Sequence, residues 1–273
     1  MAKKERLDVL VTQKGFFETR EKAKRSIMAG IVKVNNEVLD KPGTQVPIDA
    51  VIEVKGELHP FVSRGGLKLL KAIETFHIDL KNKVVMDIGA STGGFTDCSL
   101  QYGAKEVYAL DVGYGQLAWS LRQDPRVHVM ERTNFRYVKK EDLVSLQPNF
   151  ATIDVSFISL RIILEHLTTV IEAEGEVVSL IKPQFEAGKD QVGKNGIVKD
   201  PKIHTQVLQN VMSFALDKGY EPLGLTYSPI KGGEGNIEFL LYSKYLGNAA
   251  QTTTIDDYQE LIQETVRLAH EGL

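Results

Sequence analysis

The stretch over residues 84–97 constrains the fold more than any other part of the chain. An apolar run, 84–88, is followed by a glycine-rich turn, 89–94, and then by a helical pattern. A strand, a glycine turn and a helix in this order present backbone N–H groups to a nucleotide-like ligand at a helix N-terminus. Gly89 permits the tight turn, while Gly93 and Gly94 let the backbone approach a ligand closely. The stretch therefore predicts a ligand crevice at the end of a parallel strand.

The remainder of the chain supports the same fold class. From Lys83 onward, apolar runs alternate with helical patterns, which is typical of a doubly wound parallel sheet. We expect an α/β fold with a seven-stranded, Rossmann-like core. Its strands are expected near residues 83–88, 105–111, 127–131, 149–154, 175–182, 221–228 and 236–244. Its helices are expected near residues 93–102, 115–122, 158–172 and 200–219, with an earlier helix from about Arg64 to His77.

The first 58 residues predict a separate small α+β domain. Helical spacing over residues 5–14 precedes a second helix, 20–29, which Thr19 can cap. Asn35 and Asn36 tolerate positive φ and therefore predict a tight hairpin, followed by a strand near 51–54. We expect a linker over 59–66, the sheet domain over 67–247, and an acidic, helical C-terminal tail over 248–273.

Charge and composition narrow the class of protein. Residues 1–36 carry nine Lys or Arg and four Asp or Glu, whereas the whole chain has a net charge of −3. This asymmetry indicates a basic interaction module on an acidic body, although an ordinary solvated face is an equal alternative. Cys98 is the one cysteine and the six histidines are scattered, so we expect a reducing, cytoplasmic setting and no metal site. The N-terminus has no signal-peptide pattern, and no apolar run is long enough to span a membrane.

The glycine turn also indicates its ligand. It reads Asp87-x-Gly89-x-x-x-Gly93-Gly94, and an acid at this position suits an amino group and repels a pyrophosphate. S-adenosyl-L-methionine is therefore favoured over NAD, with an NAD-linked oxidoreductase as a weaker alternative. Asp111 follows Gly89 at the spacing of a ribose-binding acid. The expected cofactor-binding residues are Asp87, Gly89, Ala90, Ser91, Gly93, Gly94, Phe95, Asp111, Thr133, Asn134 and Asp154.

Two common methyl-transfer chemistries lack their residues in this chain. Attack through C5 of a pyrimidine needs a cysteine beside the base, and Cys98 lies in the helix after the glycine turn instead. Amino-group methylation of adenine uses Asn or Asp followed by two prolines and an aromatic residue, whereas Asp154 is followed by Val-Ser-Phe. Two polar strand ends remain, Asp154 and Lys182, and both are expected to face the ligand crevice.

These positions carry a resemblance to a known family. Lys68, Asp154, Lys182 and Glu238 match, in order and placement, the Lys-Asp-Lys-Glu tetrad of FtsJ-like RNA ribose 2′-O-methyltransferases. The resemblance implies a class I methyltransferase core in which Lys182 accepts the proton of the ribose 2′-hydroxyl or stabilises the developing alkoxide. Asp154 and Glu238 would orient the two lysines. These four residues are the expected catalytic residues.

The N-terminal region carries a second resemblance. Arg6-Leu7-Asp8, the helix start at Thr19-Arg20, and Val32-x-Val34-Asn35 resemble the small RNA-binding domain named after ribosomal protein S-four. Together the two halves are similar to the TlyA family, often labelled haemolysin A, from about residue 5 to 245. This implies methylation of ribosomal RNA, free or in a ribosomal subunit, and no DNA or membrane partner. The expected RNA-binding residues are Arg6, Arg20, Lys22, Lys24, Arg25, Lys33 and Arg64.

Other interpretations remain open from the sequence. The family label suggests a membrane-active haemolysin, and an RNA-binding ribosome assembly factor with an inactive core is a third class. Two cationic, glycine-bearing loops, 188–196 and 231–235, fit surface connections as well as RNA contacts. The sequence does not indicate an oligomeric state, the ribosomal RNA that is modified or the nucleotide.

Overall fold

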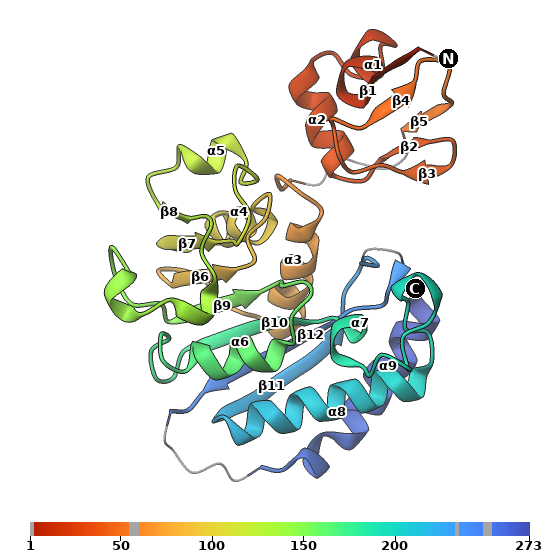
Figure 1. Cartoon of the computed structure of the whole chain (residues 1–273). Coiled ribbons are helices and arrows are strands. Elements are labelled where there is room, and N and C mark those ends of the chain that lie inside the picture. Colours follow the sequence, from red (N-terminus) through yellow and green to blue (C-terminus); the bar gives the residue numbers. More distant parts are fainter. Residues whose placement is uncertain (1–2, 55–59, 233–234, 248–252) are drawn as a thin grey trace. The chain divides into compact units, whose positions relative to one another are not determined.

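The computed structural model describes residues 3–54, 60–232, 235–247 and 253–273 (Figure 1). The chain forms two compact units, residues 1–66 and 67–273. The domain junctions expected near residues 58–59 and 247–248 fall at or beside residues outside these ranges. So does part of the cationic loop 231–235.

The N-terminal unit is a small α+β fold. Its core is formed by nine buried apolar residues, among them Leu7, Ile27 and Val32. The hairpin predicted at Asn35 and Asn36 is present, since both residues have positive φ and the flanking strands pair antiparallel. Its elements are β1 (Lys4–Arg6), α1 (Leu7–Gln13), α2 (Arg20–Met28), β2 (Val32–Val34), β3 (Glu37–Val38), β4 (Gln45–Pro47) and β5 (Ile52–Val54).

Strands β1 and β4 pair as a two-stranded sheet that the sequence did not reveal. The chain before α1 was expected to be helical from residue 5. Each of these strands has three residues, too few for a period of two to stand out. Their pairing joins segments about forty residues apart, which local patterns do not encode.

The second unit is built on a seven-stranded sheet, as predicted. Its strands are β6 (Val84–Ile88), β7 (Glu106–Leu110), β8 (Val127–Met130), β9 (Phe150–Ile153), β10 (Glu176–Ile181), β11 (Tyr220–Tyr227) and β12 (Phe239–Tyr245). The strand order is β11-β12-β10-β9-β6-β7-β8. The sheet is mixed and not wholly parallel, because β12 runs antiparallel to both β10 and β11. The β11–β12 connection is too short for a helical crossover, so the chain turns back as a hairpin.

Helices cover both faces of this sheet. Buried residues of α6 (Leu160–Leu167), α8 (Pro201–Asp217) and α9 (Gln259–Gly272) join one apolar cluster with alternate residues of the strands. On the other face, Phe76 of α3 (Gly65–Phe76) stacks on Tyr242 of β12 at a ring separation of 5.5 Å. Helix α4 (Gly94–Gln101) packs on β6 and β7.

Two short helices differ from the expected boundaries. The helix expected over 115–122 is limited to α5 (Trp119–Arg122). A four-residue helix, α7 (Pro183–Glu186), follows β10 where none was expected. Across the described ranges, no helix is long and apolar enough to cross a membrane. The same ranges contain no group of three His, Cys, Asp or Glu side chains that could hold a metal ion.

Candidate active site

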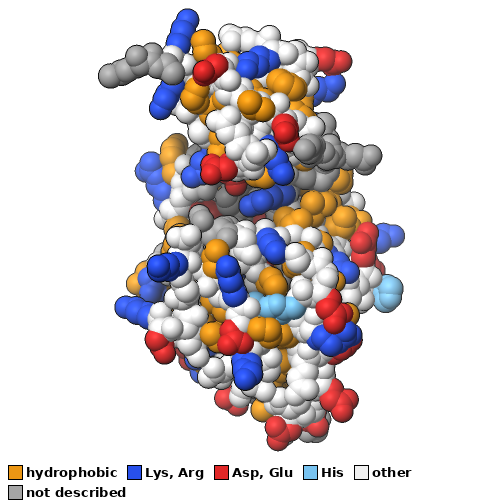
Figure 2. Space-filling model, turned by 90° about the vertical axis from the view of Figure 1, so that its right-hand side faces the viewer, with side chains coloured by type: hydrophobic (Ala, Val, Ile, Leu, Met, Phe, Trp, Pro, Cys, Tyr) orange, Lys and Arg blue, Asp and Glu red, His pale blue; other side chains and the backbone are white. Residues whose placement is uncertain are grey.

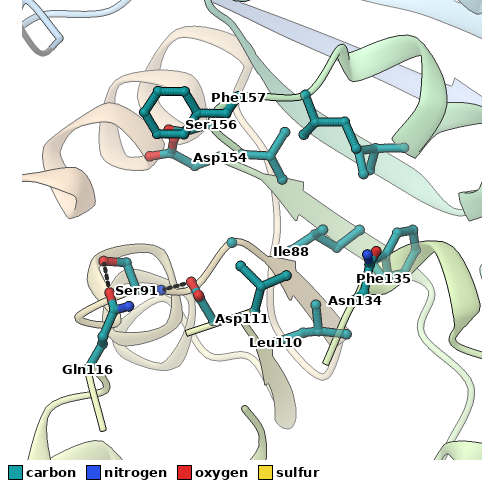
Figure 3. A pocket seen from close by; sticks show the side chains of 15 residues that line it. Ile88, Ser91, Leu110, Asp111, Gln116, Asn134, Phe135, Asp154, Ser156 and Phe157 are labelled. Atoms are coloured by element: carbon teal, nitrogen blue, oxygen red, sulfur yellow. Dashed lines mark hydrogen bonds between the residues drawn. The ribbon is translucent and has the colours of Figure 1, made fainter. Parts of the chain in front are cut away.

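A pocket of about 440 Å³ opens at the carboxyl ends of β6, β7 and β9 (Figure 3). Ligands of doubly wound sheets bind at this edge, and the volume suits a small-molecule ligand. Ser91 and Asp111 lie on one side of the pocket, and Asp154, Ser156 and Phe157 lie on the other. Apolar side chains, Ile88 and Leu110 among them, line its floor.

The glycine turn is shaped by close packing as well as by backbone conformation. Gly89 has φ +92°, and a Cβ there would lie 2.3 Å from the carbonyl oxygen of Asp154. Gly93 has φ +99°, and a Cβ there would lie 2.3 Å from Leu121. A larger residue at either position would therefore displace the pocket wall or α5.

Asp111 fixes the loops that form one side of the pocket. Its carboxylate accepts hydrogen bonds from the backbone N–H of Ser91 at 2.8 Å and of Gly113 at 2.7 Å. The Ser91 hydroxyl donates to Gln116 at 3.3 Å (Figure 3). A carboxylate has about four acceptor sites, so Asp111 keeps acceptor capacity for a ligand.

Asp87 is fully buried behind the pocket and does not line it. Its carboxylate accepts hydrogen bonds from the hydroxyls of Thr96 at 2.6 Å and Thr152 at 3.0 Å. Burial, with a smaller effect of the Asp154 charge, raises the pKa of Asp87 to about 7. In the structure this acid supports the glycine turn and the neighbouring strand instead of facing a ligand.

The other residues expected to hold the cofactor divide into two groups. Gly89, Ser91, Asp111, Asn134 and Asp154 line the pocket. Five do not line it: Ala90, Gly93, Gly94, Phe95 and Thr133.

The structure brings the four expected catalytic residues together beside this pocket. Lys68 on α3 donates a hydrogen bond to Glu238 at 2.6 Å, and its Nζ lies 4.0 Å from Asp154. The Nζ of Lys182 lies 2.5 Å from the other carboxylate oxygen of Asp154 and donates to the Ser156 hydroxyl at 3.0 Å. The charges of the site therefore alternate in the order Glu238, Lys68, Asp154 and Lys182. The Ser156 hydroxyl lies at the Lys182 end.

The two lysines dominate the electrostatics of this site. Burial alone would raise the pKa of Asp154, but the ammonium groups of Lys68 and Lys182 outweigh it and lower that pKa. Each lysine side chain is 10% exposed, so solvent screens these interactions only weakly. Asp154 therefore stays ionised between two cations.

Sequence reasoning missed two residues that shape the other side of the pocket, Phe157 and Glu186. Phe157 follows Ser156, has φ +63°, is 92% exposed, and lies with its ring 5.1 Å from that of Phe185. Glu186 on α7 accepts hydrogen bonds from the Ser159 hydroxyl at 2.7 Å and the backbone N–H of Leu160 at 2.6 Å. Glu186 therefore ties the segment after β9 to the segment after β10. The sequence signal that could have identified Phe157 is an aromatic residue that closely follows a polar strand end, Asp154.

In the N-terminal unit, two of the expected RNA-binding residues share one acid. Asp8 is fully buried and accepts hydrogen bonds from Arg6 at 3.0 Å and from Arg20 at 2.7 Å. Burial opposes ionisation of Asp8, but the two guanidinium groups outweigh it and lower its pKa. Both guanidinium groups remain about half exposed.

The other expected RNA-binding residues are held less firmly. Lys22 and Lys24 pair with acids on or beside their own helix, at 2.7 and 2.9 Å. Arg25 is exposed and Lys33 is half-buried. Arg64 lies 3.9 Å from the carboxylate of Asp40.

Comparison with known proteins matches both units. Residues 61–245 match the family described as FtsJ-like methyltransferase, and residues 5–52 match the S4 domain. A Bacillus subtilis protein named "Putative rRNA methyltransferase YqxC" is 55% identical over 272 residues, covering 100% of this chain and 96% of that protein.

Two further relatives agree with this match. The Mycobacterium tuberculosis "16S/23S rRNA (cytidine-2′-O)-methyltransferase TlyA" is 41% identical and covers 89% of this chain and 90% of its own length. A solved structure titled "Putative hemolysin from Streptococcus thermophilus" is 50% identical, has a TM-score of 0.79, and covers 100% of this chain and 98% of that chain. The resemblance drawn from the motifs is confirmed: the chain belongs to the FtsJ-like methyltransferase family and carries an N-terminal S4 domain.

Proposed function

We propose that this protein methylates ribose 2′-hydroxyl groups of ribosomal RNA, with S-adenosyl-L-methionine as the methyl donor. The observation that carries the proposal is the chain of ion pairs among Glu238, Lys68, Asp154 and Lys182 beside a cofactor-sized pocket. The TlyA relative, named as an rRNA (cytidine-2′-O)-methyltransferase, supports the reaction and the substrate class.

The residues of the pocket fit the cofactor. Asp111 retains acceptor sites for ribose hydroxyls, and Leu110 and Phe135 offer apolar surface for a flat ring. Asn134 lies beside Phe135 and offers polar atoms at the same end. The bound cofactor would supply a methyl group already activated by its positive sulfur. Everything else in the reaction falls to the side chains around the acceptor hydroxyl.

Lys182 is the residue that would act on that hydroxyl. A ribose hydroxyl is a poor nucleophile, so its proton must be removed or its developing charge stabilised as the methyl is transferred. The Nζ of Lys182 is directed by two acceptors, Asp154 and Ser156. To act as a base, the Lys182 ammonium must first release a proton to solvent, and the resulting neutral amine has two N–H donors and one lone pair. Two hydrogen bonds to these acceptors would therefore leave the lone pair for the proton of the substrate.

Lys68 and Glu238 would act through Asp154. Glu238 is buried, with 1% of its surface exposed, and its strong pairing with Lys68 holds that ammonium near Asp154. This arrangement keeps Asp154 ionised, and an ionised Asp154 orients Lys182. The alternation of charge also prevents the buried site from becoming strongly positive or negative, which would be costly in a region of low dielectric.

Two features support RNA as the acceptor. Arg6 and Arg20 present half-exposed guanidinium groups that Asp8 fixes in position, which suits contacts to phosphates. Phe157 offers an exposed aromatic face at the rim of the pocket. Enzymes that modify RNA commonly stack an unpaired base on such a face.

The test is methyl transfer to ribosomal subunits purified from cells that lack this protein. The protein is incubated with radiolabelled S-adenosyl-L-methionine and each subunit, and the RNA is then hydrolysed with alkali. A 2′-O-methylated ribose blocks cleavage at the following phosphate, so label in alkali-resistant dinucleotides is the expected result. Label on a base, label in protein, or no label on either subunit would contradict the proposal.

A further inference from the structure

A second pocket, of about 370 Å³, lies on the larger unit apart from the cofactor pocket. It is formed by residues 197–199, by Lys231, Gly235 and Ile237 from the β11–β12 connection, and by His270 of α9. No residue of this pocket lines the cofactor pocket, and none belongs to the predicted catalytic or cofactor-binding sets.

One wall of this second pocket is held by a buried asparagine. Asn236 accepts a hydrogen bond from the backbone N–H of Val198 at 3.0 Å and donates to the carbonyl of Gly196 at 2.9 Å. Its own carbonyl accepts from the N–H of Gly232 at 2.9 Å. These hydrogen bonds join the segment that carries Lys199 to the connection that carries Lys231, and they fix the spacing of the two backbones.

A histidine pair also belongs to this region: His270 lines the pocket, and the buried His204 holds its ring. Nε2 of His204 lies 3.1 Å from the carbonyl oxygen of Val198, so this nitrogen must carry the hydrogen. Burial, and to a lesser degree His270, lowers the pKa of His204 to about 4, so His204 is neutral at physiological pH. Its Nδ1 is then an acceptor and receives the Nε2 hydrogen of His270 at 3.0 Å. The pair fixes the tautomer and orientation of the His270 ring at the pocket.

Among the described residues that line this pocket, the exposed charged side chains are two lysines. Lys199 and Lys231 are exposed, and neither forms an ion pair with any residue in the described ranges. Two neighbouring acids are engaged elsewhere: Asp200, which follows Lys199, caps α8, and Glu271, which follows His270, pairs with Arg267. Figure 2 shows one face of the protein, on which Lys and Arg side chains are interspersed with Asp and Glu side chains.

The same connection also contacts the predicted catalytic residues. Ile237 lines the second pocket and Glu238 is the next residue. A Cβ on Gly232 would collide with the Glu238 carboxylate, so the backbone next to Lys231 packs directly on that acid. The connection that carries Lys231 therefore packs against the residue that pairs with Lys68.

We propose that this pocket, called the phosphate pocket below, binds a backbone phosphate of the RNA strand close to the nucleotide that is methylated. The inference rests on the proposed function, because it requires an RNA strand to pass the predicted catalytic residues. Lysines that lack ion pairs suit a phosphate, which gains from charge without needing a fixed angle of approach. The walls joined by hydrogen bonds would hold that phosphate and so add to the affinity for the strand.

The test compares two double variants of the full chain with equal changes of charge. Lys199→Gln/Lys231→Gln removes both phosphate-pocket lysines. Lys81→Gln/Lys105→Gln removes two exposed lysines just before β6 and β7, at the opposite edge of the sheet. We expect the first variant to bind ribosomal RNA about tenfold more weakly, because it forms fewer phosphate contacts. The salt slope, which is the slope of log affinity against log salt concentration, should become shallower by roughly one to two. Its KM for subunits should rise in proportion, with kcat and the affinity for S-adenosyl-L-methionine within about twofold of wild type.

The control variant should bind RNA with an affinity and salt slope close to those of wild type. The inference is wrong if both variants weaken binding equally, or if the phosphate-pocket variant loses kcat at an unchanged KM. Unchanged cofactor affinity shows that the variant is folded. If wild-type protein transfers no methyl group to either subunit, the proposed function fails. The RNA-binding comparison still decides separately whether the phosphate pocket contacts the strand.

Discussion

Among the described residues, each unit of this protein has one carboxylate flanked by two cations. In the N-terminal unit, Asp8 receives hydrogen bonds from Arg6 and Arg20. In the larger unit, Asp154 lies between Lys182, at 2.5 Å, and Lys68, at 4.0 Å. In both places the cations outweigh burial and lower the pKa of the acid.

The two centres differ in the type and exposure of their cations. The side chains of Arg6 and Arg20 are 45% and 52% exposed, whereas those of Lys68 and Lys182 are 10% exposed. A guanidinium does not lose its proton in proteins, so the Asp8 centre can only hold and direct charge. A nearly buried lysine can exchange a proton with a neighbouring hydroxyl. The same motif thus suits phosphate binding in one unit and proton transfer in the other.

The largest effect is expected at Lys182. We expect Lys182→Ala to lower kcat for methyl transfer by roughly 10²–10⁴, the range of a positioned general base. Binding of RNA and of S-adenosyl-L-methionine should change little. The measurement is single-turnover methyl transfer at saturating RNA and cofactor.

Lys182→Arg distinguishes a proton acceptor from a residue that only stabilises the developing negative charge. Arginine keeps the positive charge but cannot accept a proton. If Lys182 acts as the base, Lys182→Arg should be as inactive as Lys182→Ala. Substantial activity in the arginine variant would show that charge stabilisation suffices, and near-wild-type activity in Lys182→Ala would refute both roles.

Asp87 is a third buried acid, and among the described residues no cation pairs with it to lower its pKa. Asp87 accepts hydrogen bonds from the hydroxyls of Thr96 and Thr152, and burial raises its pKa from its ordinary value near 3.8 to about 7. Its folded-state pKa lies above the unfolded value, so protonated Asp87 favours the folded state at low pH. This contribution is complete below about pH 4 and is lost as the pH rises through 7.

We therefore expect Asp87→Asn to stabilise the protein increasingly between pH 5 and pH 8. At about 1.4 kcal/mol per pKa unit, the gain at pH 8 is at most roughly 4 kcal/mol, and adjustment of the Thr96 hydroxyl to an amide will reduce it. The measurement is the difference in Tm between variant and wild type across this pH range. A difference that stays constant or narrows as the pH rises would show that Asp87 is already ionised at low pH.

The Asp8 centre is tested by removing its guanidinium groups. Arg6→Ala/Arg20→Ala should weaken RNA binding by about ten- to a hundredfold and reduce the salt slope by roughly two. At saturating RNA, kcat should stay close to wild type, in contrast to Lys182→Ala. The matched variant is Arg6→Lys/Arg20→Lys, which keeps both charges but loses the planar fork that binds Asp8. We expect it to lie between the alanine variant and wild type, and an affinity equal to wild type in the alanine variant would remove these residues from the RNA interface.

The sequence predicted the sheet well because its strands are buried. Apolar runs marked all seven strands to within a few residues, and Asn35-Asn36 marked the hairpin by its tolerance of positive φ. The residue pattern of β12 did not reveal its direction, but the seven residues between the expected strands 221–228 and 236–244 already excluded a helical crossover and so indicated a hairpin. The three-residue strands β1 and β4 were missed because their pairing is non-local.

For the candidate site, the sequence predicted residue types better than orientations. The positions of Lys68, Asp154, Lys182 and Glu238 were readable from strand ends and from a family pattern, and the structure brings them together. Asp87 was expected to face a ligand. Its side chain instead meets hydroxyls from the next helix and strand, and this depends on tertiary packing.

Glu186, unlike Asp8 and Asp154, is an acid whose main partners are uncharged. It is nearly buried, the nearest cation, Arg161, is 3.9 Å away, and burial raises its pKa. Glu186→Ala leaves the Ser159 hydroxyl and the Leu160 N–H without their acceptor, which should loosen the segment carrying Phe157 and lower kcat about five- to tenfold. Glu186→Gln keeps a carbonyl acceptor and should retain at least half of the wild-type kcat. Steady-state methyl transfer to subunits measures both variants, and equal losses in the two would mean that the charge of Glu186, more than its hydrogen bonds, holds this segment.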